Sequence, residues 1–253
     1  MVHEVAAAGF NDAADYEAAR PSYPQEAVDW FVEKLHIAPE SRVCDLAAGT
    51  GKLTRLLTPT GAWLVACEPV PGMRAVFRAA VPGVPLVAGT SEALPFRAGS
   101  LDAIVVAQAW HWFDHERAIA EARRALKAHG SLGIVWNARE RSEAWVNEVW
   151  SIMDRVEKHA PWRDHENWRE SAIAPMPGFG EVEIVEFRHF QDISVEDMVR
   201  RVASVSHVAV LPEAEKAAVL GEVRHVIATH PDTAGRETLQ IPYRVDCFAT
   251  TKT

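Results

Sequence analysis

The chain has 253 residues, enough for one large α/β domain or two small ones with a substantial core. Hydrophobic residues make up 48% of it and charged residues 24%, as in ordinary globular proteins, and the formal net charge is −9 at pH 7. Such a surface repels phosphate backbones, so nucleic acid is not expected as a partner. No apolar run approaches the roughly 20 residues of a membrane span, and the N-terminus lacks a signal-peptide core. We therefore expect a cytoplasmic protein without a membrane partner.

The three cysteines, Cys44, Cys67 and Cys247, show no paired spacing. We expect them to be buried, reduced thiols rather than a disulfide or metal ligands. The sequence contains neither a CxxC nor an HExxH motif, so no metal site is predicted.

The first half of the chain alternates between helix-like and strand-like segments. The stretch SYPQEAVDWFVEKLHIAPE is predicted to form a helix that residues 39–40 end, with Pro24 in its first turn and its apolar residues on one stripe. Strand and helix then alternate five times between residues 41 and 137. Because the strands are short, continuous apolar runs, they are typical of a parallel sheet covered on both faces. The predicted strands are 42–46, 62–68, 84–89, 101–108 and 131–137, and the predicted helices are 51–57, 71–80 and 115–130, the last ending at Gly130.

The pattern changes after Asn137. A Trp-bearing helix is predicted over 142–160, and an alternating segment at 181–190 favours an antiparallel strand. Two helical stretches follow, 195–205 and 212–229, before a last strand at 238–252. The stretch 160–180 is rich in proline and glycine and is interpreted as a loop inside one domain.

The first predicted strand is followed by a turn with two glycines, in the stretch DLAAGTG that ends at Gly51. In an open parallel sheet, ligands bind beyond the carboxyl ends of the strands. A phosphate-binding P-loop is excluded, because Leu46 stands where that motif needs its first glycine. A nicotinamide-binding turn matches at Gly49 and Gly51 but has Thr54 in place of its third glycine. Glu68 ends the second strand and fits the ribose of any adenosine ligand, so it does not discriminate between them.

Several stretches, taken in order, resemble the class I S-adenosylmethionine-dependent methyltransferase family, type 11 branch. They are DLAAGTG with the acid that ends the second strand, VACEPVPGMRAVFRAA, and VAGTSEALPFRAGSLDAIVVAQAWHWFD. ADYEAARPSYP is similar to the N-terminal cap of the trans-aconitate methyltransferase subgroup. The resemblance covers residues 10–140. With it we predict a Rossmann-like, doubly wound α/β fold. Its sheet has seven strands, mostly parallel with an antiparallel last strand, and an N-terminal helical cap is added.

The resemblance implies S-adenosyl-L-methionine as the cofactor. Glu68 would accept hydrogen bonds from both ribose hydroxyls, and Asp45 would face the methionine end or cap the following turn. Ala47 replaces the glycine that is commonest in the family, and its methyl group can be accommodated if the position keeps a negative φ. Arg20 would grip the cofactor carboxylate, with Tyr16 one helical turn before it. The other implied contacts are Gly49 and Gly51 through their backbone, Pro69 beside Glu68, Met73 at the adenine or ribose unless it is plain core, the Ser91 backbone and Glu92 at the adenine, and Gln108 at the methionyl portion.

The methyl acceptor is expected beside the stretch AWHWFDHER, which follows the fourth strand. Aromatic faces attract a sulfonium cation, so Trp110 and Trp112 are predicted substrate contacts, unless one of them is core. Trp136 and Asn137 end the fifth strand beside the same cleft. His111 is the candidate catalytic base for a hydroxyl or amine acceptor, or else only a hydrogen-bonding group.

The stretch 136–168 is rich in tryptophan, which suits a lid over an apolar or flat substrate, although core packing explains most of these residues equally well. Similarity to the trans-aconitate enzymes suggests a small carboxylic acid as the acceptor, which would need no base. The candidate arginines for holding it are Arg139, Arg141 and Arg163.

We therefore predict a single methyltransferase domain over residues 1–253. Cap helices occupy 1–38, the cofactor-binding core 41–137, and sheet completion with a substrate lid 138–253. The protein would transfer a methyl group to a small-molecule carboxylate or hydroxyl by in-line displacement, as a monomer or homodimer. The alternatives are an NAD(P)-dependent oxidoreductase and a non-catalytic protein that binds S-adenosylmethionine.

Overall fold

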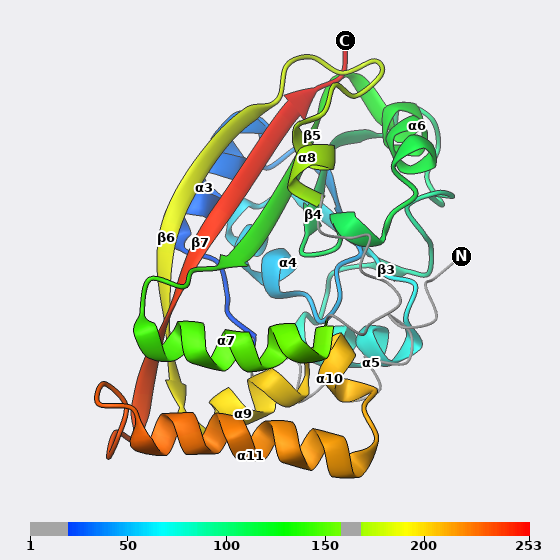
Figure 1. Cartoon of the computed structure of the whole chain (residues 1–253). Helices are drawn as coiled ribbons and strands as arrows, with labels where there is room; N and C mark the ends of the chain where they lie inside the picture. The colour runs from blue at the N-terminus through cyan, green and yellow to red at the C-terminus, as the bar shows by residue number, and fades with distance from the viewer. Residues whose placement is uncertain (1–19, 158–167) are drawn as a thin grey trace.

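The fold is built on one seven-stranded sheet with the order β3-β2-β1-β4-β5-β7-β6 (Figure 1). The structure is a computed structural model and describes residues 20–157 and 168–253. Strands β1 to β5 run parallel, and β7 is antiparallel to both β5 and β6, which confirms the predicted sheet. The strands are β1 (Arg42–Leu46), β2 (Trp63–Cys67), β3 (Leu86–Val87), β4 (Leu101–Ala107), β5 (Leu126–Arg139), β6 (Glu183–Ser194) and β7 (Thr238–Thr251).

Helices cover both faces of the sheet because its strands are apolar on both sides. Along β4, Val105 packs with α3 and α4, whereas its neighbours Ile104 and Val106 pack towards α6 and α8. Helix α3 lies so close to β5 that a Cβ atom on Gly133 would come within 2.5 Å of the Phe31 ring. The helices are α3 (Gln25–Lys34), α4 (Lys52–Leu57), α5 (Pro71–Ala80), α6 (His115–Ala125), α7 (Ala144–Glu157), α8 (Trp168–Ile173), α9 (Val195–Ala203), α10 (Ser206–Ala209) and α11 (Glu213–Thr229).

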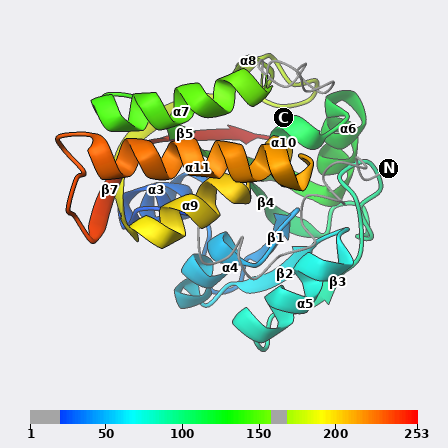
Figure 2. The same ribbon diagram turned by 60° about the horizontal axis from the view of Figure 1, so that its bottom comes forward.

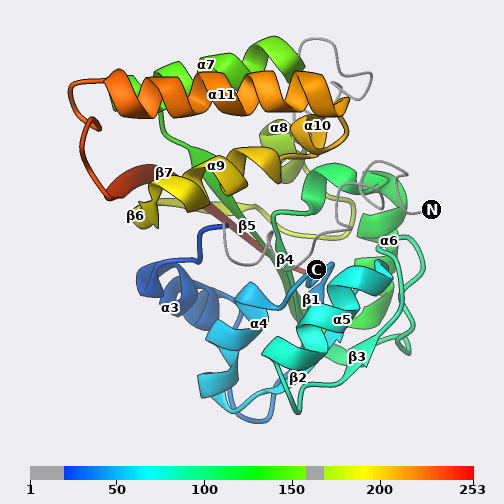
Figure 3. The same cartoon turned by 90° about the horizontal axis from the view of Figure 1, so that it is seen from below.

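Four of these helices, α7, α9, α10 and α11, form a separate layer beyond the carboxyl end of β5 (Figure 1). We call them the helical layer. It lies on the β5–β7 side of this end of the sheet, whereas α4 and α5 lie on the β1–β2 side (Figures 2 and 3). The layer has its own core, which includes Trp150, Val202 and Val223 together with Leu239 and Tyr243 of β7. The ligand-binding end of the sheet therefore has a helical body beside it.

One predicted boundary is wrong. The helix predicted over 115–130 ends at Ala125, and Leu126 already belongs to β5, so Gly130 is not its terminator. Leu126 is fully buried and pairs with Leu101 of β4. Lys127 places its ammonium 2.7 and 2.8 Å from the two carboxylate oxygens of Asp102. Burial and pairing against β4 thus outweigh the helical pattern of the sequence.

The other predicted helices and strands lie within a few residues of their predicted bounds, although β3 has only two residues. The prediction of a loop over 160–180 is wrong in part, because α8 lies within it, and α10 was not predicted. Residues 1–19 of the predicted N-terminal cap lie outside the described part of the chain, and α3 packs on a face of the sheet. The three cysteines are buried and unpaired, as predicted. Burial raises the pKa of Cys67 and of Cys247 to about 12, so both thiols stay protonated near neutral pH. None of the described helices has the length and apolar character needed to cross a membrane.

Candidate active site

Two acidic side chains are buried at the carboxyl ends of β1 and β2. Asp45 is the penultimate residue of β1 and is 2% exposed, and Glu68 directly follows β2 and is 4% exposed. The strands pair in parallel, with Asp45 opposite Ala66, so both carboxylates lie at the same edge of the sheet. This is the edge where ligands bind in open α/β sheets.

The Glu68 carboxylate joins two loops. Its Oε2 accepts a hydrogen bond from the Gly49 N–H at 2.9 Å, and its Oε1 accepts one from the Val70 N–H at 2.7 Å. Arg74 fixes the same loop from outside, since its Nη1 donates to the carbonyl oxygens of Glu68 and Pro69 at 3.0 and 2.6 Å. Burial raises the pKa of Glu68, and the two N–H bonds oppose that rise. The turn after β1 and the start of α5 are therefore held together through one side chain.

Only one of the two carboxylate oxygens of Asp45 accepts a hydrogen bond from the described residues. The Thr54 hydroxyl of α4 donates a short hydrogen bond to its Oδ2. Its Oδ1 is buried and has no hydrogen-bond partner in the described residues. Burial raises the pKa of Asp45 to about 7, with the Glu68 carboxylate adding to the rise and Thr54 opposing it. Thr54 occupies the place of the third glycine in a nicotinamide-binding turn, and its bond to Asp45 is a reason for a hydroxyl there.

The turn between β1 and α4 is left-handed at three positions. Gly49 has φ +57° and Gly51 has φ +86°, and Ala47 has φ +56°. Ala47 therefore does not keep the negative φ under which its methyl group is expected to fit. The N–H groups of Ala47 and Ala48 both donate to the Cys67 carbonyl, at 2.7 and 3.3 Å, and these two bonds fix the turn. A left-handed alanine costs about 1–2 kcal/mol.

The two glycines serve different purposes. A Cβ atom on Gly49 would have no described atom within 4 Å, so this position faces open space beside Asp45 and Glu68. A Cβ atom on Gly51 would lie 2.5 Å from Val81 Cγ2 and 2.8 Å from the Phe77 ring. Gly51 is thus explained by the packing of α4 against α5, and Gly49 leaves room for a ligand.

We expect the Gly51→Ala variant to lose about 2–4 kcal/mol of unfolding free energy, from a left-handed alanine plus overpacking against Phe77 and Val81. Gly49→Ala carries only the backbone strain and is expected to lose about 1–2 kcal/mol. Urea denaturation of the ligand-free variants measures both losses. Equal losses would show that Gly51 is not a packing residue.

The predicted adenine-side residues lie together after β3. Ser91 is 4% exposed, and its hydroxyl donates to Glu92 Oε1 at 2.7 Å. The same oxygen accepts the Asp114 N–H at 3.2 Å. Burial would raise the pKa of Glu92, but hydrogen bonds, that of Ser91 foremost, lower it overall. Met73 is 3% exposed at the start of α5, so its side chain is buried in this structure.

Aromatic side chains gather at the carboxyl ends of β4 and β5. The His111 ring lies 4.5 Å from the Trp112 ring and 4.7 Å, edge-on, from the Trp136 ring, measured between centroids. All three side chains are half-buried. The turn that starts this group places Gln108 at φ +59°. His111, Trp112 and Trp136 are therefore brought together as predicted, and we call them the aromatic group.

Trp110 does not join this group. Its indole is 2% exposed, stacks on the His115 ring at 5.0 Å and donates from Nε1 to the Ser171 hydroxyl at 3.1 Å. The predicted substrate contact by Trp110 is thus not supported, and it is the core tryptophan of this stretch. Asn137 is 8% exposed, and its Nδ2 donates to the Ser22 carbonyl at 3.1 Å.

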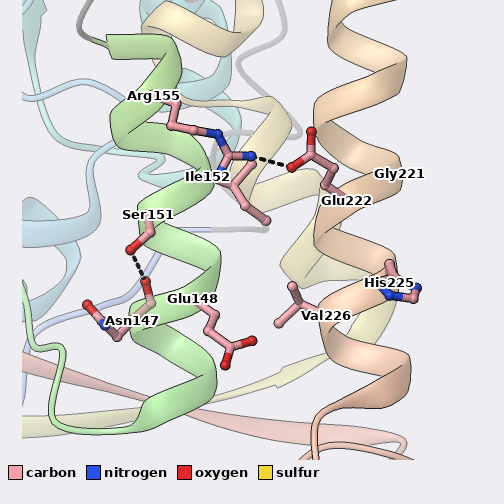
Figure 4. A pocket seen from close by; sticks show the side chains of 9 residues that line it. All are labelled: Asn147, Glu148, Ser151, Ile152, Arg155, Gly221, Glu222, His225 and Val226. Carbon is pink, nitrogen blue, oxygen red and sulfur yellow. Dashed lines mark hydrogen bonds and ion pairs between the residues drawn. The ribbon is translucent and has the colours of Figure 1, made fainter.

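A separate depression lies between α7 and α11 (Figure 4). Arg155 of α7 and Glu222 of α11 form an ion pair across it, and Glu148 and His225 also line it. These four side chains are exposed, so the depression is part of the outer surface of the helical layer.

Comparisons with known proteins agree with this geometry. A family model described as "Methyltransferase domain" matches residues 44–134, from β1 to β5. The chain is 39% identical over 236 residues to an uncharacterized methyltransferase of Mycobacterium tuberculosis, covering 93% of this chain and 92% of that protein. The chain belongs to the methyltransferase family.

Other relatives of this methyltransferase agree. It is 34% identical over 242 residues to an uncharacterized methyltransferase-like protein of Schizosaccharomyces pombe, covering 95% of this chain and 94% of that protein. A solved structure from Anaeromyxobacter dehalogenans, assigned to type II methyltransferases, is 24% identical and superimposes with a TM-score of 0.63. That alignment covers 92% of this chain and 96% of the other, and it supports the same fold.

The remaining predicted residues of the methyltransferase lie either outside the described residues or in and beside the helical layer. Tyr16 and Arg163 lie outside the described residues. Arg20 donates from Nη2 to the Ser204 carbonyl at 3.3 Å, which ties it to the end of α9. Arg141 binds both carboxylate oxygens of Asp154 at 2.8 Å. Of the tryptophans predicted as lid or core, Trp145 and Trp150 are buried in the core of the helical layer, Trp162 lies outside the described residues, and only the helical backbone of Trp168 is described.

Sequence reasoning missed several residues of the methyltransferase that the structure singles out, two at the acidic pair and one in the helical layer. Thr54 and Arg74 support the two acids, and Arg201 of α9 is a buried cation beside Trp150. A signal for Arg201 was present, since it lies three residues after Met198, in register with the apolar stripe of α9. A charged residue on such a stripe departs from the pattern of a solvated helix face.

Proposed function

We propose that this methyltransferase binds S-adenosyl-L-methionine at the carboxyl ends of β1 and β2 and transfers its methyl group to a small-molecule acceptor beside His111. The observation that carries this proposal is the buried Oδ1 of Asp45, which lacks a hydrogen-bond partner in the described residues. A buried carboxylate oxygen in that state is costly, and an ammonium group would satisfy it. The amino-acid end of S-adenosylmethionine carries such a group.

The surroundings of Asp45 fit the rest of the ligand. Each Glu68 oxygen accepts one backbone N–H and keeps a further lone pair, so the two ribose hydroxyls have an acceptor each. Gly49 is bonded to Glu68 through its N–H, and its Cβ position is open. Ser91 and Glu92, together after β3, are the proposed adenine contacts.

When bound, S-adenosylmethionine supplies a methyl group on a positively charged sulfur, which is a good leaving group. The acceptor's electron pair forms the new bond to the methyl carbon, and the pair of the broken sulfur–carbon bond stays on sulfur. The chain has to align the acceptor and exclude water, and the faces of Trp112 and Trp136 suit both tasks. His111 takes the proton of a hydroxyl or amine acceptor, whereas a carboxylate acceptor releases none.

Calorimetric titration with S-adenosylhomocysteine and with NADH tests the donor site. We expect S-adenosylhomocysteine to bind and NADH not to bind, and selective binding of NADH would refute the proposal. A screen of small metabolites with a labelled methyl donor then tests transfer. Binding of S-adenosylhomocysteine without transfer to any acceptor would instead indicate a non-catalytic cofactor-binding protein.

A further inference from the structure

Two guanidinium groups lie over one buried indole inside the helical layer. Trp150 of α7 is fully buried. The Cζ of Arg139, the last residue of β5, lies 4.6 Å from its ring centroid, and the Cζ of Arg201 of α9 lies 5.7 Å from it. The strand end, α7 and α9 therefore meet at this ring. We call Arg139, Arg201 and His207 of α10 the cationic cluster.

Arg201 is a buried charge for which residues 20–157 and 168–253 provide no ion pair. It is 3% exposed, and its Nε and Nη1 are buried without a hydrogen-bond partner in the described residues. A guanidinium in this state has lost its water and gained no ion pair, which a fold tolerates only against a large desolvation cost. Its contact with the Trp150 face recovers only part of that cost. The site is thus built to receive an acceptor of hydrogen bonds that carries negative charge.

His207 of α10 is a second buried polar side chain, and it lies close enough to Arg139 for that charge to shift its pKa. It is 4% exposed, and its Nε2 is buried without a hydrogen-bond partner in the part of the chain that the structure describes. Burial is the main cause that lowers the pKa of His207 to about 4; the charges of Arg139 and Arg20 act in the same direction, and Asp154 opposes them. The imidazole is therefore neutral at neutral pH, and with its proton on Nε2 it would donate a hydrogen bond.

The carboxylate that acts on His207 is already engaged. Asp154 influences His207, but Arg141 binds both its carboxylate oxygens at 2.8 Å. Arg20 also acts on His207, as a further positive charge. Among the charges that act on His207, two are therefore positive, and the one negative charge is bound by Arg141.

We propose that the cationic cluster binds a carboxylate group of a small-molecule ligand, with Arg201 as its principal partner and His207 as a second donor. A guanidinium binds a carboxylate through two parallel hydrogen bonds, and Arg201 has two unused nitrogens. The inference rests on the proposed function. Arg139 follows Trp136 by three residues on β5, which is about 10 Å along a strand. A carboxylate on the methyl acceptor would thus lie within small-molecule reach of the aromatic group, and the methionine carboxylate of the donor is the other source.

The test uses the variants Arg201→Met and Arg201→Lys, with Arg200→Gln as the matched control. Arg200 is the preceding residue on α9, is exposed, and pairs with Asp197 at 2.9 Å. The probes are succinate and benzoate, with succinamide and benzamide as neutral counterparts. Thermal unfolding is recorded with and without S-adenosylhomocysteine. We expect the acids, but not the amides, to raise the Tm of the wild-type protein and of R200Q.

In R201M the response to acids is expected to disappear, while the Tm without ligand is equal to or above that of the wild type, because an unmatched buried charge is gone. R201K retains the charge and is expected to keep part of the response. A purely structural arginine would behave oppositely, with a lower starting Tm in R201M and an unchanged response to acids. That result would overturn the proposal.

The affinities of R201M for S-adenosylhomocysteine and for 5′-methylthioadenosine show whether the carboxylate belongs to the acceptor or to the donor. If it belongs to the acceptor, R201M binds S-adenosylhomocysteine as the wild type does. If it belongs to the donor, R201M loses at least 10-fold in affinity for S-adenosylhomocysteine and none for 5′-methylthioadenosine, which lacks the amino-acid part. No response of the wild type to any acid, with unchanged S-adenosylhomocysteine affinity in R201M, overturns the proposal. A wild-type chain that responds to acids but does not bind S-adenosylhomocysteine refutes the proposed function and leaves this site standing.

Discussion

Replacing Glu68 by glutamine is expected to weaken S-adenosylhomocysteine binding by about 10- to 100-fold, as for the loss of charged hydrogen bonds worth about 1.5–3 kcal/mol. The glutamine keeps the shape of the side chain but has one acceptor oxygen instead of two. Its NH2 group would face either the Gly49 or the Val70 N–H, both of which now donate to the carboxylate. One ribose hydroxyl also loses its acceptor. Isothermal titration of E68Q and wild type gives the ratio of the two Kd values.

Asp102→Asn is the matched control for this variant. The Asp102 carboxylate also accepts a backbone N–H, that of Arg42 at 2.9 Å, but at the amino ends of β1 and β4. D102N loses stability through the Lys127 ion pair and is expected to bind S-adenosylhomocysteine as the wild type does. If E68Q and D102N showed the same affinity, Glu68 would not be the ribose residue.

The stability of the ligand-free protein should fall as the pH rises from about 4 to about 7. Asp45 has an ordinary pKa of 3.8, and burial raises it to about 7 in the folded chain. Between these values the folded state binds more protons than the unfolded state, so the unfolding free energy decreases with rising pH. The full effect is of order 4 kcal/mol for one group. Asp45→Asn keeps an acceptor for Thr54 and removes this titration, so its profile should lack that component.

The same carboxyl group makes ligand binding depend on pH. An ammonium group at Asp45 favours the carboxylate, so binding expels the proton that the ligand-free protein holds below about pH 7. We expect S-adenosylhomocysteine affinity to drop by up to 10-fold per pH unit below pH 7. Calorimetry in buffers of different ionisation enthalpy measures the proton released. A pH-independent affinity, equal in slope to that of D45N, would place the ammonium elsewhere.

The parallel strands of the sheet could be predicted because each contains a continuous apolar run, and β6 could be predicted from its alternation. The run 42–46 became β1 without change, and the helix at 71–80 became α5. The boundary between α6 and β5 could not be predicted, because Leu126 and Lys127 suit a helix and owe their strand conformation to β4. The local sequence pattern does not predict a boundary correctly where pairing with a segment distant in sequence determines the conformation.

Some residues of the candidate site could likewise be predicted from local sequence, and others depend on contacts distant in sequence. Glu68 and Gly49 follow from the order of strand, turn and acid, and the structure places them within one hydrogen bond. The conformation of Ala47 depends on the Cys67 carbonyl and the role of Gly51 on α5, neither of which the turn sequence reveals. The position of Arg201 beside Trp150 could not be predicted, because it depends on how α7, α9 and the end of β5 pack together.

The last strand, β7, runs through both hydrophobic cores. Leu239 and Ile241 belong to the core of the helical layer, while Val245 and Cys247 belong to that of the sheet. From Thr238 to Ala249 every residue is paired with β6, without a break between the two regions. Unfolding of the helices alone would expose Leu239 and Ile241 of the shared strand. We therefore expect the helical layer and the sheet edge with Asp45 and Glu68 to unfold as a single cooperative unit.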